Sequence, residues 1–152
     1  MQETIRELQQ IIFGYTVMLE SITEDNYSFK PRPEKWSRKE ILGHLVDSAQ
    51  NNIRRFVVGQ YEDNPRITYR QDDWVTIAHY QEYPVKDLID LWVLLNKHIC
   101  RVLTSMPESL AKRTVDTNAT EFHSIEWLAQ DYNKHLLHHL HQVLDLEPVA
   151  YP

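Results

Sequence analysis

The sequence predicts an all-α fold, a four-helix bundle formed by a single domain. The prediction rests on four segments in which apolar residues recur every three or four positions, and on the presence of only three glycines. So few glycines remove most of the tight turns that β-hairpins need. A chain of 152 residues, 42% of them hydrophobic, is long enough to bury one core, so we assign residues 1–152 to one domain.

The first helix is predicted by an apolar stripe near the N-terminus and should end before Pro31. The stripe consists of Ile5, Leu8, Ile12, Tyr15 and Leu19. A second helix is predicted over about 38–58, because Ser37 can cap its start while the Glu40 side chain reaches back to the backbone amide of the cap.

A loop over residues 59–70 and a short helix around 73–80 are predicted next, from turn-forming residues and a brief apolar pattern. Pro84 then begins a long amphipathic helix that runs to about Met106.

Residues 108–122 are polar and rich in threonine, so we expect a long connection there. Ser124 offers a cap for the last helix, which should run to about Leu146.

Composition and charge exclude several classes of function. A net charge of -6 argues against binding nucleic acid through a basic face. Uninterrupted apolar stretches reach only five residues, at 91–95, far below the roughly 20 that cross a bilayer. The N-terminus is acidic and unlike a signal peptide, and one cysteine fits a reducing compartment, so we expect a cytoplasmic protein. Cys100 lies in an apolar helix and is expected to be a buried, unreactive thiol rather than a nucleophile.

Histidine is abundant, with eight residues, and two of them lie one turn apart in the last helix. His135 and His139 occupy positions of the stripe that should face the bundle interior, so both rings lie on one face and can bind one metal ion. His44 in the second helix is the predicted third ligand. Three imidazoles leave an open position on a divalent ion, which is typical of a catalytic site. The alternative is that these histidines are satisfied by hydrogen bonds alone.

Other side chains are candidates for supporting roles. Ser48, Asn51 and Arg55 continue the polar stripe that begins at His44, and with Trp74 they are candidates for substrate contact. Arg55 could instead form a salt bridge, and Trp74 could be a core anchor.

The candidates for orienting the metal ligands are Asp47, Asp131 and His138, although solvated helix-face carboxylates are more common. Around the axis of the last helix, His141 lies more than 100 degrees from the face that carries His135 and His139, so it is not expected to bind metal.

Known motifs for other chemistries are missing. The sequence contains no Glu-x-x-His, which a ferritin-like di-iron bundle requires, and no His-Glu-x-x-His of zinc proteases. It also lacks a glycine-rich phosphate loop and a Gly-x-Ser-x-Gly elbow.

The sequence resembles the DinB-like superfamily, and more closely its YfiT-like branch, from about residue 30 to 145. The similar segments are Lys35-Trp36-Ser37, Gly43-His44-Leu45-Val46-Asp47-Ser48 with Asn51 and Arg55-Phe56, Asp63-Asn64-Pro65, Asp72-Asp73-Trp74, and Tyr132-Asn133-Lys134-His135 with His138-His139.

The resemblance implies that His44, His135 and His139 bind a divalent metal, usually nickel or zinc. It also implies an up-down-down-up four-helix bundle that often forms a homodimer. Activities in the wider family include transfer of low-molecular-weight thiols such as bacillithiol and thiol-dependent isomerisation, and many members are described only as candidate metal-dependent hydrolases.

These observations lead to three functional hypotheses that share one metal site. The leading one is an enzyme that transfers a low-molecular-weight thiol to a small electrophile, with the thiol as co-substrate. The second is a hydrolase of a small ester or amide that uses metal-bound water. The third is a non-catalytic bundle that binds a metal or ligand in a stress response. Three imidazoles suit zinc, nickel, copper and iron(II), so the sequence does not select the metal.

Overall fold

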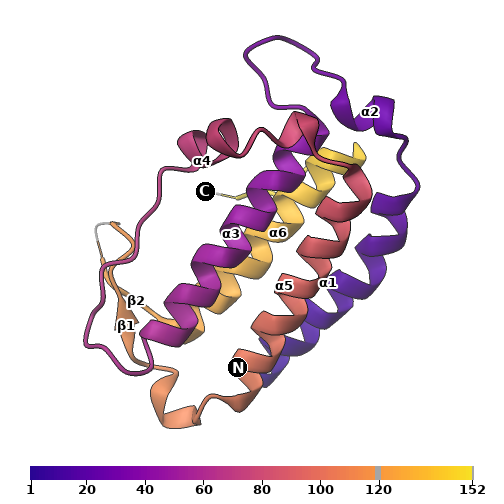
Figure 1. Ribbon diagram of the computed structural model, residues 1–152. Coiled ribbons are helices and arrows are strands. Elements are labelled where there is room, and N and C mark those ends of the chain that lie inside the picture. The colour runs from indigo at the N-terminus through magenta and orange to yellow at the C-terminus, as the bar shows by residue number, and fades with distance from the viewer. Residues whose placement is uncertain (119–120, 152) are drawn as a thin grey trace.

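A computed structural model describes residues 1–118 and 121–151 (Figure 1). Residues 119, 120 and 152, which belong to the predicted domain and in part to the predicted connection at 108–122, lie outside the described part. Four long helices form the molecule, as expected: α1 (Gln2–Glu20), α3 (Arg38–Val58), α5 (Val85–Ser105) and α6 (Ile125–Leu144). No described helix has the length and apolar character that crossing a membrane requires.

The four helices form an up-down-down-up bundle. In Figure 1, α1 and α6 run in one direction, and α3 and α5 run in the opposite one. Each helix packs against one parallel and one antiparallel neighbour. Helix α3 contacts the parallel α5 and the antiparallel α6, and helix α1 contacts the parallel α6 and the antiparallel α5. Two consecutive parallel helices need a long crossover, and residues 59–84 provide it. Because α3 and α6 are neighbours, side chains from these two helices can form one site.

One apolar cluster fills the space between the four helices. Trp92 of α5 is fully buried, as are Leu45 and Phe56 of α3. On α6 the buried residues continue past Tyr132 to Leu136, Leu140 and Val143. The expected stripe on this helix was therefore wrong in its second half, where it placed His135 and His139 toward the interior. The histidines are only partly buried and lie beside the core, and Gln142 is exposed.

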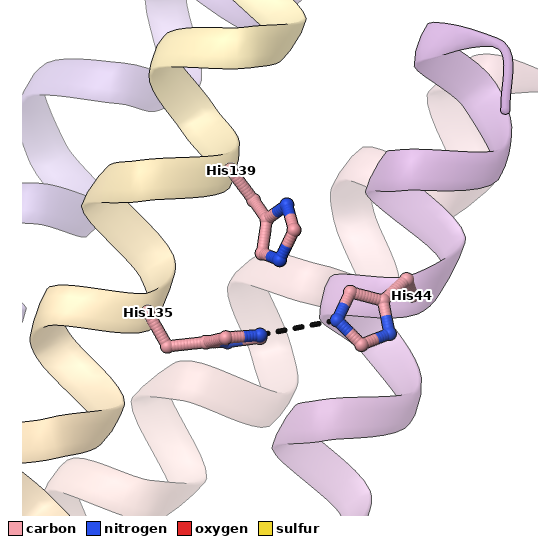
Figure 2. A group of neighbouring side chains, drawn as sticks. All are labelled: His44, His135 and His139. Atoms are coloured by element: carbon pink, nitrogen blue, oxygen red, sulfur yellow. Dashed lines mark hydrogen bonds between the residues drawn. The ribbon is translucent and has the colours of Figure 1, made fainter. Parts of the chain in front are cut away.

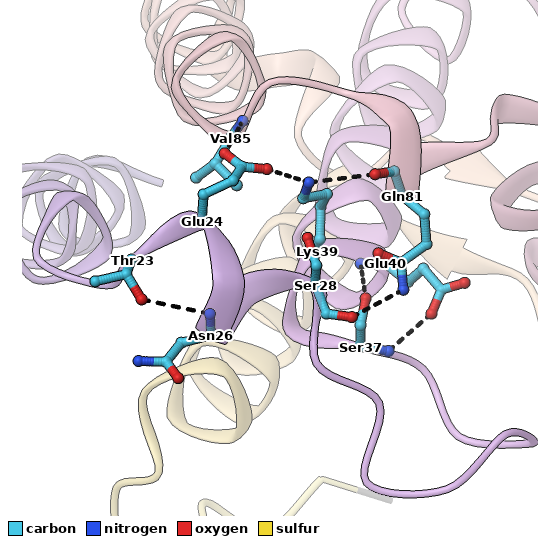
Figure 3. Close-up of polar contacts among 9 residues, drawn as sticks. All are labelled: Thr23, Glu24, Asn26, Ser28, Ser37, Lys39, Glu40, Gln81 and Val85. Carbon is cyan, nitrogen blue, oxygen red and sulfur yellow. Dashed lines mark hydrogen bonds and ion pairs between the residues drawn. The ribbon is translucent and has the colours of Figure 1, made fainter.

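The start of α3 is fixed by the capping box that the sequence predicts. Ser37 Oγ accepts a hydrogen bond from the Glu40 amide at 3.1 Å, and the Ser37 amide donates to Glu40 Oε2 at 2.7 Å (Figure 3). The two bonds satisfy two amides that the first helical turn leaves without partners. They fix where α3 begins, at Arg38, six residues before His44.

A short helix, α2 (Glu24–Ser28), follows α1, which ends at Glu20, well before Pro31. Its Glu24 pairs with Lys39 of α3 and accepts the Val85 amide at the start of α5 (Figure 3). Lys39 is 2% exposed, so its charge depends on this carboxylate. The pair ties α2 to the starts of α3 and α5.

The crossover between α3 and α5 contains α4 (Gln71–Ala78) and a 3₁₀ turn, η1 (Tyr80–Glu82). Helix α4 begins two residues earlier and ends two residues earlier than the predicted 73–80. Tyr80 packs so closely on Gly43 of α3 that a Cβ atom there would lie 2.2 Å from the Tyr80 ring. Gly43 is thus required by packing, and the crossover is held against the helix that carries His44.

The connection before α6 has more structure than its polar sequence indicates. It holds a 3₁₀ turn, η2 (Glu108–Leu110), and two short strands, β1 (Thr114–Val115) and β2 (His123–Ser124), which pair in antiparallel fashion. The Ile67 amide donates to Asp116 O at 2.9 Å, which joins this connection to the crossover. Ser124 caps α6 as predicted, accepting the Trp127 amide at 3.1 Å, and the helix ends at Leu144.

Candidate metal centre

The structure brings His44, His135 and His139 together between α3 and α6. One ring nitrogen from each histidine lies within 4.8 Å of those of the other two. Figure 2 shows the three rings pointing toward one another, with His44 on α3 and the other two one turn apart on α6. This is the constellation of residues that the sequence proposes as metal ligands.

The geometry fits a single divalent ion. The Nε2 atoms of His44 and His135 are 3.1 Å apart. Two imidazole nitrogens bound to one ion at about 2.0–2.1 Å with tetrahedral angles lie about 3.3 Å from each other, so little adjustment is needed. Among the described residues, the group of potential metal ligands at this point consists of these three histidines. A four-coordinate ion would therefore have one position left for a ligand from solution.

Burial keeps the three imidazoles neutral. It lowers the pKa of His44 from 6.5 to about 4 and the pKa of His135 to about 2, and nearby His139 adds to both effects. The pKa of His139 is also lowered, again chiefly by burial. Metal ions bind the neutral form of histidine, so near neutral pH no proton has to be removed.

Gln142 of α6 orients His139. The ring nitrogen Nδ1 of His139 donates to Gln142 Oε1 at 2.8 Å, which directs Nε2 toward the other two histidines. The amide nitrogen of Gln142 donates to His138 Nε2 at 2.8 Å, and His138 Nδ1 donates to Val149 O at 2.7 Å. Both ring nitrogens of His138 are therefore engaged, so it supports His139 through Gln142 instead of serving as a fourth ligand.

The other two rings are held by packing and by a hydroxyl group. Trp36 packs against His44, with ring centroids 5.3 Å apart. Ser48 Oγ lies 3.4 Å from His135 Nδ1. His44 Nδ1 is buried and has no hydrogen-bond partner among the described residues. This atom lies on the far side of the ring from the cluster, because Nε2 is the nitrogen that faces His135.

A pocket of about 440 Å³ adjoins the three-histidine cluster. Its lining comes from α3, α4, α6, the loop before α4 and the C-terminal tail, and most of the lining side chains are polar. The lining residues are Ser48, Asn52, Arg55, Tyr69, Gln71, Asp131, Tyr132, His135, His138, His139 and Tyr151. Two ligands of the candidate metal site therefore face this space.

Two of the four predicted substrate-contact residues line the pocket. Ser48 and Arg55 line it. Asn51 does not: it is buried and donates to Asp47 O at 2.9 Å, and its neighbour Asn52 faces the pocket instead. Trp74 packs on Tyr69 with ring centroids 5.6 Å apart and lies outside the lining.

The two predicted orienting carboxylates have different surroundings. Asp47 accepts a hydrogen bond from Tyr80 and none from a histidine of the described residues, so its expected role at the metal ligands is not seen. Burial raises its pKa to about 6, against the lowering effect of that bond. Asp131 lines the pocket and accepts the Tyr151 hydroxyl at 2.9 Å.

Several pocket residues escaped sequence analysis. Tyr151 reaches the pocket from the C-terminal tail, and Tyr69 from the loop before α4, so no local pattern connects them to the histidines. Gln142 could have been found, since it lies three residues after His139 on the same helix.

Cys100 lies apart from this centre. It is buried on α5 beside a separate groove, and burial raises its pKa to about 11. A thiol with a raised pKa carries little thiolate near neutral pH, which agrees with the expected unreactive role.

A model of the DinB superfamily matches residues 14–143 of the sequence, a span that includes all three histidines. The chain belongs to the DinB superfamily. This agrees with the resemblance found in the sequence. Two relatives of this DinB-superfamily chain are named as candidate metal-dependent hydrolases. One, from Halalkalibacterium halodurans, is 24% identical over 140 residues, covering 91% of this chain and 81% of the relative. The other, from Oceanobacillus iheyensis, is 27% identical over 112 residues, covering 73% of this chain and 64% of the relative.

Solved structures confirm the fold of this DinB-superfamily chain. YfiT from Bacillus subtilis, described as a candidate metal-dependent hydrolase with an unusual four-helix bundle topology, superposes with a TM-score of 0.85 at 20% identity, covering 95% of this chain and 83% of YfiT. A mycothiol-dependent maleylpyruvate isomerase superposes with a TM-score of 0.77 at 12% identity, covering 98% of this chain and 61% of the isomerase. At these identities the likeness concerns the fold.

Proposed function

We propose that the chain hydrolyses a small ester or amide with one divalent metal ion held by His44, His135 and His139. The observation that carries this proposal is the convergence of three neutral imidazoles on one point beside a polar pocket. The sequence alone favours thiol transfer. The relatives named as candidate metal-dependent hydrolases shift the preference to hydrolysis.

When bound, a divalent ion in a three-histidine site supplies Lewis acidity and a water molecule of lowered pKa. The chain supplies the rest. His44, His135 and His139 hold the ion and leave the side toward the pocket open. Asp131, one turn before His135 on α6, is the carboxylate among the described lining residues, so it is placed to accept and return a proton. The Tyr151 hydroxyl, bonded to Asp131, fixes the orientation of that carboxylate.

Transfer of a low-molecular-weight thiol is the second candidate function. It is supported by the structural likeness to an isomerase that depends on mycothiol. In such a reaction the thiol loses its proton, its sulfur forms a bond to an electrophilic carbon, and the leaving group departs with the electron pair of the broken bond. The same open side of the three-histidine cluster would receive the thiol.

Zinc and nickel are the metals we propose, since both accept imidazole ligands. The proposed substrate is a small molecule, because a pocket of about 440 Å³ lies within the range of small-molecule sites.

The deciding experiment compares metal-free, zinc-loaded and nickel-loaded protein on a panel of small p-nitrophenyl esters and anilides, with and without a thiol. Turnover that needs metal but no thiol supports hydrolysis. Turnover that occurs only with thiol, together with loss of free thiol, supports transfer.

The same assay needs a matched pair of variants. His135→Ala should abolish either activity, whereas His98→Ala, an exposed histidine on α5, should leave it unchanged. Stoichiometric metal without turnover under any condition would favour the non-catalytic binding hypothesis.

A further inference from the structure

Arg55 is a partly buried cation that faces the pocket without a carboxylate partner. Its Nε and Nη2 atoms donate to Ile67 O, each at 3.3 Å, and Nη1 donates to Asn52 Oδ1 at 3.4 Å. These acceptors are neutral, and the distances are long for N–H···O bonds. Within the described part of the chain, Arg55 forms no ion pair with a carboxylate. The salt bridge considered for Arg55 from the sequence is therefore not seen.

The surroundings of Arg55 hold the guanidinium in place without a direct ion pair. The Tyr69 ring lies beside it, with its centroid 5.9 Å from the guanidinium carbon. Asp131 lines the same pocket, but its Oδ2 atom accepts the Tyr151 hydroxyl. Asp131 favours the charged form of Arg55 through space but forms no direct ion pair with it. The guanidinium is therefore free to bind the two oxygens of a carboxylate, for which its planar shape is suited.

We propose that the substrate carries a carboxylate that Arg55 binds, while the reacting ester or amide carbonyl lies at the three-histidine cluster. This inference rests on the proposed metal site and names the substrate class: a small carboxylic acid that contains an ester or amide. Arg55 is the single Lys or Arg among the described lining residues, and Asp131 faces the same space. One cation opposite an acidic residue suits a carboxylate with one negative charge better than a phosphate with two.

The helix geometry limits the length of this substrate. Ser48, which lies next to His135, and Arg55 are two turns apart on α3, a rise of about 10 Å. The Arg55 side chain leans back toward the start of the helix, so the distance from guanidinium to metal site is shorter than the separation of the two backbone positions. A short aliphatic chain between carboxylate and carbonyl fits this distance.

The test uses inhibitors that do not react. Monohydroxamates of succinic, glutaric and adipic acid each carry a metal-binding group at one end and a carboxylate at the other. The matched probes carry a neutral carboxamide in place of the carboxylate. Isothermal calorimetry on zinc-loaded protein should show at least tenfold tighter binding of the best carboxylate probe than of its carboxamide partner. A phosphonate probe that binds tighter than the carboxylate would overturn the assignment to carboxylates.

Variants assign the preference to Arg55. Arg55→Gln should remove it while carboxamide binding stays as in the wild type, and Arg55→Lys should keep part of it. Arg54 directly precedes Arg55 and is exposed, so Arg54→Gln should keep the full preference for the carboxylate probe. Equal binding of both probes to the wild type, or a preference that survives Arg55→Gln, would overturn the proposal.

A second measurement is independent of the metal. In metal-free protein, titration with glutarate should shift the NMR signal of the Arg55 Nε–H group, and glutaramide should not. No shift with millimolar glutarate would overturn the carboxylate site. Because neither measurement needs turnover, a lack of hydrolysis would refute the proposed activity and leave the carboxylate site to be judged by these results.

Discussion

The Nε2 atoms of His44 and His135 lie 3.1 Å apart, although 91 residues separate these histidines along the chain. In the metal-free protein these two atoms form a hydrogen bond, in which one neutral ring carries its hydrogen on Nε2 and donates it to the other ring. Burial lowers the pKa of both rings and keeps them neutral, the form in which histidine binds metal. With the ring hydrogen on Nδ1 instead, both Nε2 atoms would be free to bind one divalent cation, so we expect the site to take up metal.

The wild-type protein should bind close to one equivalent of zinc or nickel, and His135→Ala and His139→Ala should each lose it. Each substitution removes one of three nitrogen ligands. Elemental mass spectrometry on untagged, dialysed protein measures the metal content. His98→Ala on α5 is the control and should keep the full equivalent. If the wild type takes up no zinc or nickel at neutral pH, the metal centre is refuted.

Removing Gln142 should weaken metal binding without removing a ligand. The Gln142 amide fixes the ring of His139 through an Nδ1–H···O bond of 2.8 Å. Loss of such an orienting partner typically lowers metal affinity by about 10-fold to 100-fold. Competition with a chromophoric chelator measures the affinity of Gln142→Ala, and Gln130→Ala, exposed on the same helix, serves as the control. Equal affinities of the two variants would show that Gln142 does not orient His139.

The metal-free protein should lose stability as the pH falls from about 7 to about 5. In the unfolded chain His44 and His135 take up protons near pH 6.5, but in the folded protein they do so only near pH 4 and pH 2. The unfolded state therefore gains protons first. Asp47, whose pKa is raised to about 6, opposes this trend because its folded form gains a proton first. The net loss should be on the order of 2 kcal/mol in the free energy of unfolding.

Urea unfolding of chelator-treated protein at the two pH values measures this loss. Asp47→Asn should make the loss larger, because it removes the opposing contribution while its amide oxygen can still accept the Tyr80 hydroxyl. A free energy of unfolding that is equal or higher at the lower pH would contradict the lowered histidine pKa values.

Short-range signals predicted the parts of the site that a single helix determines. The capping box at Ser37 and Glu40 set the start of α3, and the spacing of His135 and His139 placed both rings on one face. The substrate residues were harder to assign. Asn51 and Asn52 both follow Ser48 at helical spacing, and only the packing of α3 against its neighbours decides that Asn52 faces the pocket.

Contacts between distant segments could not be predicted from the sequence. Glu24 reaches Lys39 and the Val85 amide, and a polar run of five residues gives no sign of such partners. Tyr151 similarly bonds to Asp131 from the tail after α6. In both cases the stabilisation comes from tertiary contact. Helix α2 depends on it in particular, because a helix of five residues is marginal by itself.

The homodimer expected from the family resemblance stays a prediction, for which the exposed apolar side chains of α1 and α5 provide a test. Phe13 and Val17 on α1 are 86% and 69% exposed, and Leu94 on α5 is 64% exposed. They lie on neighbouring helices, so a second copy that covers them would bury apolar surface. Sedimentation equilibrium should give twice the chain mass for the wild type and for Phe29→Ser, and the chain mass for Phe13→Ser. A monomeric wild type would refute the dimer, and a dimeric Phe13→Ser would exclude this face.

Two glycines in long helices should respond to alanine in opposite ways. A Cβ atom at Gly43 would lie 2.2 Å from the Tyr80 ring, whereas at Gly14 no heavy atom lies within 4 Å. Gly14→Ala should therefore raise the free energy of unfolding by about 0.5–1 kcal/mol, since alanine restricts the unfolded chain and favours helix. Gly43→Ala should lower it by about 1–3 kcal/mol, because Tyr80 is buried and held by Asp47.

Urea unfolding of the two variants checks both signs, and a double-mutant cycle identifies the cause. In a Tyr80→Leu background, which removes the ring, Gly43→Ala should cost less than it does in the wild type. If its cost is the same in both backgrounds, the contact with Tyr80 is not the reason for glycine at this position. A cost that disappears with the ring would show that close packing of Tyr80 on α3, one residue before His44, is what requires glycine at this position.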